Sequence, residues 1–182
     1  MRSGAAYGNK GLYDQEISDY NKALEINPRD AEAYYNRGIA YGNKGLYDQA
    51  ISDYNKASEI NPGFAEAYIN RGVAYAEKGD YDHAISDYNK ALEINPRVAM
   101  AYYNRGSAYA EKGDYDHVIS DFTKALEINP RLADAYNNRG IAYYFKREYD
   151  KAWEDVHKAQ SLGYQVHLEF LKDLRKASGR QR

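Results

Sequence analysis

The chain has no cysteine among its 182 residues, so no disulfide bond can stabilise it and no thiolate is available for catalysis. It also lacks any run of about 18 apolar residues, the length that a membrane-spanning helix needs. The first residues, MRSGAAYGNKG, contain no apolar segment of the kind found in signal peptides. For a complete chain, these absences predict a cytoplasmic protein that does not enter a membrane and is stabilised by packing.

An excess of positive charge is absent as well. The chain has 25 Lys and Arg against 27 Asp and Glu, a formal net charge of -2 at pH 7. Proteins that bind nucleic acid usually present a basic face, because neutralising phosphates drives their affinity. We therefore expect no nucleic-acid partner. A local basic excess near the C-terminus is better explained by a solvated terminal helix; it comprises Lys172, Arg175, Lys176, Arg180 and Arg182.

Proline is scarce, and its placement is regular. The four prolines each close a copy of the motif EINP, and consecutive copies are 34 residues apart: Pro28, Pro62, Pro96 and Pro130. A fixed period of this length is typical of repeat architectures. The period divides the chain into an incomplete first repeat (1–30), three closely similar repeats (31–64, 65–98 and 99–132) and a divergent last repeat (133–164).

Within each repeat, the spacing of apolar and small residues predicts two helices. In repeat 31–64, Tyr34, Gly38 and Tyr41 are four and three residues apart, so they share one helix face. Gly45 then ends the first helix in a left-handed conformation. Pro62 ends the second helix, because proline lacks the N–H that a helix interior requires. The face of that second helix consists of Ala50, Tyr54, Ala57 and Ile60. We expect most of the 21 tyrosines to serve packing between such helices.

This pattern resembles the tetratricopeptide repeat. In that family, an aromatic residue, a glycine, a tyrosine, an alanine, an aromatic residue, an alanine and a proline follow one another within 34 residues. They occur here as Tyr34, Gly38, Tyr41, Ala50, Tyr54, Ala57 and Pro62, and in the next two repeats only Val118 and Phe122 differ. The resemblance extends to about residue 162. It implies an all-α fold, a right-handed superhelical solenoid of antiparallel helical hairpins.

The two ends depart from the repeat. The first repeat lacks about four residues of its first helix and has Ser3 where the others have arginine. After the last repeat, the segment VHLEFLKDLRKA resembles the helix that covers the final hairpin in such arrays. We predict a C-terminal capping helix over 165–178, followed by a frayed tail at 179–182. Four apolar residues would face the last repeat: Val166, Phe170, Leu171 and Leu174.

One column differs systematically from the family, because arginine replaces the Leu-like residue before the glycine. The arginines are Arg37, Arg71, Arg105 and Arg139. An aspartate column precedes the aromatic residue of each second helix, at Asp53, Asp87, Asp121 and Asp155. An arginine fork can bind a carboxylate through two hydrogen bonds while its stem is buried. We therefore predict that the two columns form structural ion pairs.

Catalytic residue patterns are hard to find. His83 and His117 occupy the same position in successive repeats, which would place them about 10 Å apart in a stack of helices. That distance is too long for a shared metal ion. Neither a P-loop nor a dinucleotide-binding glycine motif is present. An active site needs different residues that converge, whereas this chain repeats the same residues along a line. We predict no enzymatic activity, no cofactor and no metal.

In the tetratricopeptide repeat family, the first helix of each hairpin lines a concave groove, so first-helix positions away from the packing face are the candidate binding residues. An asparagine side chain carries a donor and an acceptor, which match the peptide group of an extended chain. Alternatively, each asparagine bonds to its own scaffold. The candidate residues are Tyr35, Asn36, Ile39, Asn43, Ile69, Asn70, Val73, Glu77, Tyr103, Asn104, Ser107, Glu111, Asn137, Asn138, Ile141, Tyr144 and Phe145.

The predicted function is that of a non-catalytic scaffold that binds an extended or helical peptide segment of another protein in this groove. Some members of the family bind a C-terminal carboxylate with basic groove residues. Those positions hold Glu32, Glu66, Met100 and Asp134, or Tyr35, Ile69 and Tyr103, so a neutral or mildly basic segment fits better. Three other interpretations stay open: self-association into homo-oligomers, a regulatory fragment of a larger protein, and a recently duplicated or engineered array.

Overall fold

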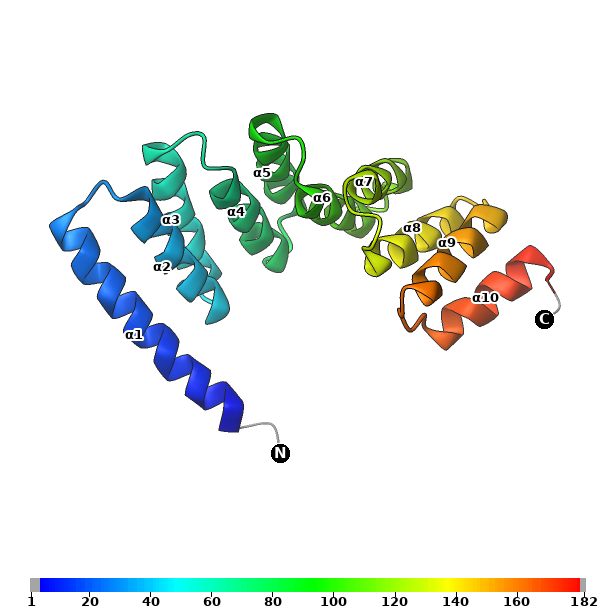
Figure 1. Ribbon diagram of the computed structural model, residues 1–182, viewed down its shortest axis with the longest axis horizontal. Helices are drawn as coiled ribbons and strands as arrows, with labels where there is room; N and C mark the ends of the chain where they lie inside the picture. Colours follow the sequence, from blue (N-terminus) through cyan, green and yellow to red (C-terminus); the bar gives the residue numbers. More distant parts are fainter. Residues whose placement is uncertain (1–3, 181–182) are drawn as a thin grey trace. The chain divides into compact units, whose positions relative to one another are not determined.

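A computed structural model describes residues 4–180, with side chains from residue 11 onward. Over this range the chain forms ten α-helices and no β-strand (Figure 1). The helices belong to two compact units, an N-terminal unit (1–96) and a C-terminal unit (97–182). Each unit has its own hairpins and its own buried residues.

The N-terminal unit contains two helical hairpins preceded by a single long helix. The helices are α1 (Gly4–Ile26), α2 (Ala31–Asn43), α3 (Tyr47–Ile60), α4 (Ala65–Glu77) and α5 (Tyr81–Ile94). The hairpins are α2 with α3 and α4 with α5, α3 packs on α4, and α1 packs on α2. The hairpins coincide with the repeats predicted at 31–64 and 65–98.

The C-terminal unit repeats this arrangement. Its helices are α6 (Ala99–Glu111), α7 (Tyr115–Ile128), α8 (Ala133–Phe145), α9 (Tyr149–Ser161) and α10 (Leu168–Ser178). The hairpins are α6 with α7 and α8 with α9, α7 packs on α8, and α10 packs on α9. The predicted all-α architecture of successive helical hairpins is therefore the observed one.

Small residues allow the two helices of a hairpin to approach closely. A Cβ atom on Gly72 in α4 would lie 2.7 Å from Cε1 of Tyr88 in α5, a distance that carbon atoms do not tolerate. Gly38 and Tyr54 show the same relation in the preceding hairpin. Tyr88 is consequently buried against the helix backbone, and burial raises the pKa of its phenol.

The predicted arginine–aspartate pairs are present in each of the four hairpins. Arg37 donates from Nε and Nη2 to the two carboxylate oxygens of Asp53, both at 2.7 Å, and Arg139 binds Asp155 at 2.8 Å in the same way. Arg71–Asp87 and Arg105–Asp121 repeat this geometry. The remaining nitrogen of Arg139 donates to Thr123 on the preceding hairpin at 2.9 Å. The column therefore joins helices within a hairpin and between neighbouring hairpins.

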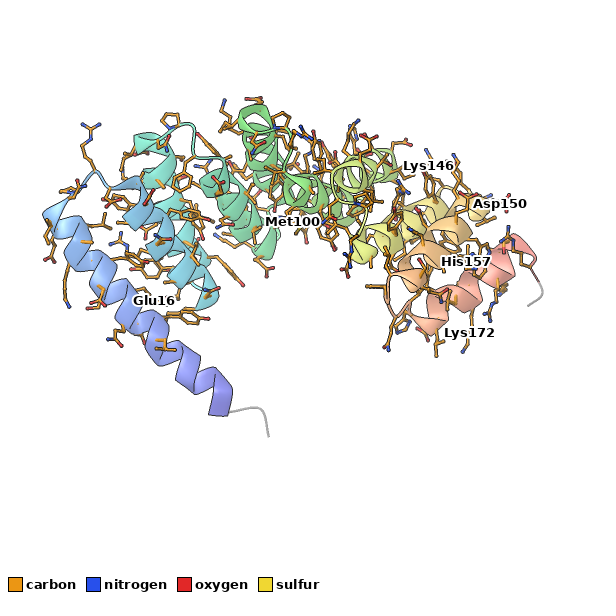
Figure 2. The ribbon with its side chains drawn as sticks, in the orientation of Figure 1. Glu16, Met100, Lys146, Asp150, His157 and Lys172 are labelled. Atoms are coloured by element: carbon orange, nitrogen blue, oxygen red, sulfur yellow. The ribbon has the colours of Figure 1, made fainter. Side chains whose placement is uncertain are left out.

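A second series of ion pairs joins a residue just after a helix to the preceding helix pair or, for Lys44, to α1. The pairs are Lys44–Asp14, Lys78–Asp48, Lys146–Asp116 and Arg180–Asp150. In Figure 2, Lys146 marks the end of α8 and Asp150 the start of α9. Because the aspartates of these pairs are largely exposed, each pair contributes little stability, at most about 1 kcal/mol.

The first repeat differs from the sequence expectation. Residues 4–26 form one continuous helix rather than a hairpin with a shortened first helix. Gly11 aligns with Gly45, which ends α2 in the left-handed conformation at φ 73°, yet Gly11 lies inside a helix. The ten residues before Gly11 include few large apolar side chains, so a separate first helix would bury too little surface to offset the cost of a turn. Ser3 lies outside the described residues.

At the other end, α10 covers the last hairpin. Val166, Leu171 and Leu174 are buried together with Trp153 and Val156 of α9. Phe170 packs at the edge of this cluster. Gly179 ends the helix, and Arg180 donates to Asp150 at 2.8 Å, so the chain is held against α9 one residue beyond the glycine. The sequence predicted a frayed tail over 179–182. Residues 179 and 180 are described in the structure, whereas residues 181–182 lie outside the described residues.

Candidate functional site

The candidate binding residues of the N-terminal unit lie on α2 and α4, which are neighbours in the structure. Tyr35 projects from α2 and packs between Phe64, at 4.7 Å between ring centroids, and Tyr54, at 6.0 Å. Asn70 of α4 donates from Nδ2 to the Tyr35 hydroxyl at 3.0 Å. This bond connects the first helices of two successive hairpins, and it leaves the Asn70 side-chain oxygen as a potential acceptor.

The same arrangement recurs on α6 and α8 of the C-terminal unit. Asn138 donates to the Tyr103 hydroxyl at 3.3 Å and accepts from Asn137 at 3.1 Å. Asn137 is only 6% exposed, so its amide is not accessible to a partner, and its hydrogen bond helps to hold the side chain of Asn138 in place. The Ser107 hydroxyl donates to the carbonyl of Tyr103 in its own helix. These contacts reduce the number of candidate groups that are available to a partner.

Two of the four asparagines in this column therefore bond to the protein's own scaffold, which is the alternative to peptide binding that the sequence left open. Asn70 and Asn138 each spend their amide donor on a tyrosine of the preceding repeat. Position 69, which corresponds to Tyr35 and Tyr103 in the repeat, holds isoleucine and has no hydroxyl to accept such a bond. Asn36 and Asn104 are both half-buried on their helices. The four asparagines are therefore not equivalent, despite their regular spacing.

The two tyrosines of these bonds are held in their protonated form. Burial raises the pKa of Tyr35, and the negative charge of Glu66 raises it further. Burial likewise raises the pKa of Tyr103, assisted by Asp134. Both phenols remain neutral around pH 7 and accept from the asparagines with a hydroxyl oxygen. The bonds between first helices are consequently insensitive to pH in the neutral range.

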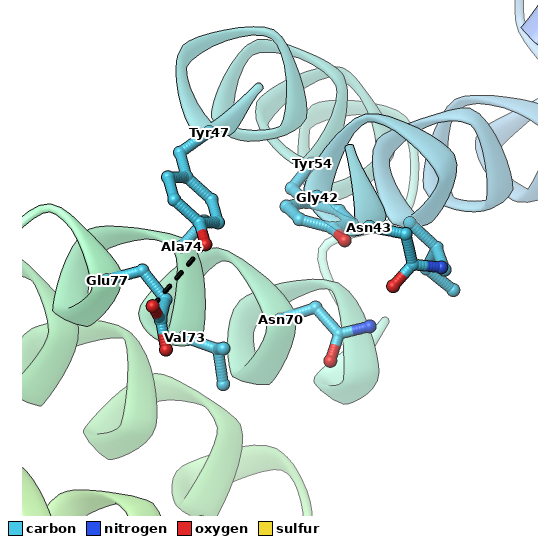
Figure 3. A pocket seen from close by; sticks show the side chains of 9 residues that line it. Gly42, Asn43, Tyr47, Tyr54, Asn70, Val73, Ala74 and Glu77 are labelled. Atoms are coloured by element: carbon cyan, nitrogen blue, oxygen red, sulfur yellow. Dashed lines mark hydrogen bonds between the residues drawn. The ribbon is translucent and has the colours of Figure 1, made fainter. Parts of the chain in front are cut away.

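A pocket of about 380 Å³ opens between α2, α3 and α4 (Figure 3). Five of its lining residues were predicted from the sequence: Ile39, Asn43, Asn70, Val73 and Glu77. The other four are Gly42, Tyr47, Tyr54 and Ala74. From the sequence, the tyrosines were expected to serve packing, and Gly42 was not among the candidate residues. The sequence could have drawn attention to Gly42, because the size of the side chain at this repeat position varies strongly. The later repeats have Ala76, Ala110 and Tyr144 there.

One side of the pocket is acidic and the other is apolar. The Tyr47 hydroxyl donates to Oε2 of Glu77 at a long distance of 3.4 Å. The charge of Glu77 raises the pKa of Tyr47. Val73 is 37% exposed, and Ile39 is a second aliphatic residue that lines the pocket. The pocket therefore combines an accessible carboxylate with aliphatic surface.

The corresponding position of the C-terminal unit is aromatic instead. Phe145 replaces Glu77 and stacks on Tyr115 at 4.7 Å with an interplanar angle of 9°. Tyr144, which precedes Phe145 on α8, makes edge contacts with Phe145 and with Phe170 of α10. Phe145 is still 54% exposed. The two units therefore present different chemistry at equivalent positions.

The histidines of the repeated motif YDH have a structural explanation. Asp80 and Asp114 accept from the backbone N–H of His83 and His117 at the starts of α5 and α7. The imidazole of His117 stacks on Tyr109 at 4.5 Å. Across residues 4–180, no group of His, Asp and Glu side chains has a geometry that could hold a metal ion. Within the same range, no helix is both long enough and apolar enough to span a bilayer.

Comparison with known proteins identifies the class. Sequence models described as tetratricopeptide repeat match residues 31–64, 65–98 and 99–132. Related models, described as TPR repeat and tetratricopeptide repeat, match residues 4–45 and 122–154. Because these matches cover more than half of the chain, it belongs to the tetratricopeptide repeat family. No curated protein sequence matches the chain.

Solved structures of other tetratricopeptide-type proteins share the fold. A crystal structure of MamA is 29% identical, with 99% of each chain covered and a TM-score of 0.79. YrrB, described as a TPR protein with an unusual peptide-binding site, is 25% identical, with 93% of this chain and 85% of that chain covered and a TM-score of 0.73. PilF of Pseudomonas aeruginosa, at 22% identity, covers 97% of this chain and 81% of its own with a TM-score of 0.82, and shows the fold alone. The chain is thus a tetratricopeptide repeat solenoid, a fold that serves protein interaction.

Proposed function

We propose that the chain is a non-catalytic scaffold that binds a peptide segment of a partner protein on its first-helix face. This face comprises the candidate residues on α2 and α4 in the N-terminal unit and on α6 and α8 in the C-terminal unit. The observation that carries the proposal is the pocket between α2, α3 and α4, because five predicted binding residues from two successive hairpins line it. Pockets with apolar walls and a few polar groups are the usual form of binding sites.

The groups on this face suit a polypeptide ligand. Ile39 and Val73 offer aliphatic surface to a side chain, and the side-chain oxygen of Asn70 can accept a backbone N–H. In the C-terminal unit, exposed Phe145 offers a large and rigid contact area. By contrast, the arginines of the four hairpins are committed to internal ion pairs and do not face a ligand. The description of YrrB as peptide-binding supports the same use of the fold.

A selection of peptides tests this proposal. A phage library of random peptides is selected on the intact chain, and the affinity of the enriched peptides is measured by fluorescence anisotropy. Val73→Asn and Ile141→Asn change the first-helix face of the two units. We expect at least one of these variants to bind roughly tenfold more weakly, as replacement of a central contact does.

The matched controls carry the same new side chain on second helices. Ser86→Asn and Ser120→Asn change exposed residues of α5 and α7. Affinity should stay within a factor of about two of the original chain in both controls, since surface substitutions away from an interface have small effects. The proposal fails if no peptide is enriched, or if the first-helix variants bind as well as the controls.

A further inference from the structure

We propose that the pocket between α2, α3 and α4 takes the side chain of a lysine or arginine of the partner peptide. The aliphatic stem would lie on Ile39 and Val73, and the cationic group would meet the carboxylate of Glu77. This inference rests on the proposed function and specifies the partner that the site prefers. Three features of the pocket carry it: its shape, its charge and its contrast with the C-terminal unit.

The shape suits a long, unbranched side chain. Ile39, Val73, Ala74 and the ring of Tyr54 form apolar surface along the pocket. Gly42 adds no side chain to this surface, and a Cβ added there would still lie 3.9 Å from the Tyr54 hydroxyl, so the space beside that hydroxyl is not tightly filled. Lysine and arginine bury their methylene stems on such surfaces while the charged group stays near water.

The charge suits a cation. The hydroxyl of Tyr47 is 3.4 Å from Glu77, so this weak bond leaves the carboxylate with most of its acceptor capacity. The neighbouring lysine does not neutralise Glu77, because Lys78 is bonded to Asp48. The amide oxygens of Asn43 and Asn70 lie around the same opening and can accept further donors. No basic residue lines this pocket.

The C-terminal unit lacks this combination at the equivalent position. There the acid is replaced by Phe145, and its ring stacks on Tyr115. The position equivalent to Gly42 holds Ala110. Aromatic rings therefore occupy the place of the Glu77 carboxylate, and the carboxylate of this region, Glu111, stands instead at the position of Asn43. The arrangement of aliphatic wall and carboxylate proposed here is therefore specific to the pocket in the N-terminal unit.

Peptides enriched on the intact chain give the first test. Each lysine or arginine of an enriched peptide is replaced by norleucine, which keeps an unbranched stem without the charge. At one position, the replacement should weaken binding by about fivefold, the effect of one partly screened ion pair. With Glu77→Gln, the same replacement should have almost no effect, because the partner charge is gone. Glu93→Gln, which removes an exposed carboxylate that pairs with Lys90, should behave as the original chain.

A second test does not depend on peptides. n-Butylguanidinium and n-butanol are titrated separately into the chain with labelled Ile and Val methyl groups, and the NMR shifts of Ile39 and Val73 are followed. The guanidinium probe should shift both methyl signals at lower concentration than butanol. Glu77→Gln should remove this difference, and Gly42→Tyr should block both probes, since the array already accepts tyrosine at Tyr144.

The outcomes separate the two proposals. Enriched peptides that need no basic residue, together with equal titrations of the two probes, would overturn the inference and leave the peptide-binding face intact. Guanidinium binding that depends on Glu77, without any enriched peptide, would support the charge preference of the pocket and overturn the proposed function. A Glu77→Gln variant that binds butylguanidinium as well as the original chain would also contradict the inference.

Discussion

Arg71 contacts side chains on two different hairpins. Its Nε and Nη2 atoms donate to Asp87 of α5, and Nη1 donates to Asn55 and Ser58 of α3. The hydrogen bonds to Asp87 raise the pKa of the guanidinium, so Arg71 stays charged. Asp87 is 5% exposed. A carboxylate that is buried this far is stable only while its partner is present.

Replacement of Arg71 by leucine would restore the residue type that the family usually has before the glycine. We expect Arg71→Leu to lower the free energy of unfolding by about 3 kcal/mol, because Asp87 would be left buried without a partner. Urea denaturation followed by circular dichroism measures this change. Peptide affinity of the folded variant should change far less, since Arg71 does not line the first-helix pocket.

The double variant Arg71→Leu/Asp87→Leu is the control for this explanation. Removal of both charges should recover much of the stability that the single variant loses, because no uncompensated carboxylate remains. If the double variant is as unstable as the sum of the two single variants, then the buried charge is not the cause of the loss.

Arg147 has an unfavourable backbone conformation. Its φ of 62° lies in the left-handed region, where the earlier repeats have Gly45, Gly79 and Gly113. A residue with a Cβ atom loses about 1 kcal/mol or more in this conformation. We therefore expect Arg147→Gly to raise the free energy of unfolding by about 1 kcal/mol, measured by urea denaturation. Gly113→Arg should lower it by a similar amount, and a neutral effect of both changes would argue against strain at this turn.

At the scale of the element, α10 has the register of a first helix. Leu174 stands 34 residues after Gly140, at the position where the repeats have glycine. In a hairpin, that glycine leaves space for a side chain of the second helix, as Gly72 does for Tyr88. Within the described residues no second helix follows α10. In α10, the side chain of Leu174 itself occupies the space that a second helix would otherwise fill, and it is completely buried.

This role predicts a large effect of shortening Leu174. Leu174→Ala should lower the free energy of unfolding by about 3 kcal/mol, because the cavity would lie against Trp153 and Val156. Leu168→Ala is the matched control, since Leu168 is 72% exposed and its loss should cost less than about 0.5 kcal/mol. Hydrogen exchange should also become faster in α9. Equal effects of the two substitutions would contradict a covering role for α10.

At the scale of the whole molecule, the sequence predicts the structural features that recur at the same position in every repeat. The hairpins follow from residues three and four apart, and their ends follow from Gly45 and Pro62. The arginine–aspartate pairs follow because both residues recur in register in every hairpin. Such features need no knowledge of side-chain conformation, and the structure contains them all.

The binding face is less predictable, because it depends on differences between repeats. The bond from Asn70 exists because position 35 is tyrosine, whereas the corresponding position 69 of the next repeat is isoleucine. Gly42 lines the pocket without adding a side chain to it, and a pattern of large residues does not reveal such a position. The continuity of α1 depends on how much apolar surface a shortened first helix could bury, and the repeat pattern does not contain that information.

The central claim is that a partner peptide binds to the first helices, and site-specific labelling tests it most directly. Because the chain has no cysteine, a single introduced cysteine carries an environment-sensitive fluorophore at one known position. Val73→Cys and Ile141→Cys report on α4 and α8, and Ser86→Cys and Ser120→Cys report on α5 and α7. Addition of an enriched peptide should shift the emission at positions 73 or 141 to shorter wavelength and leave positions 86 and 120 unchanged. Shifts confined to positions 86 and 120 would contradict the account.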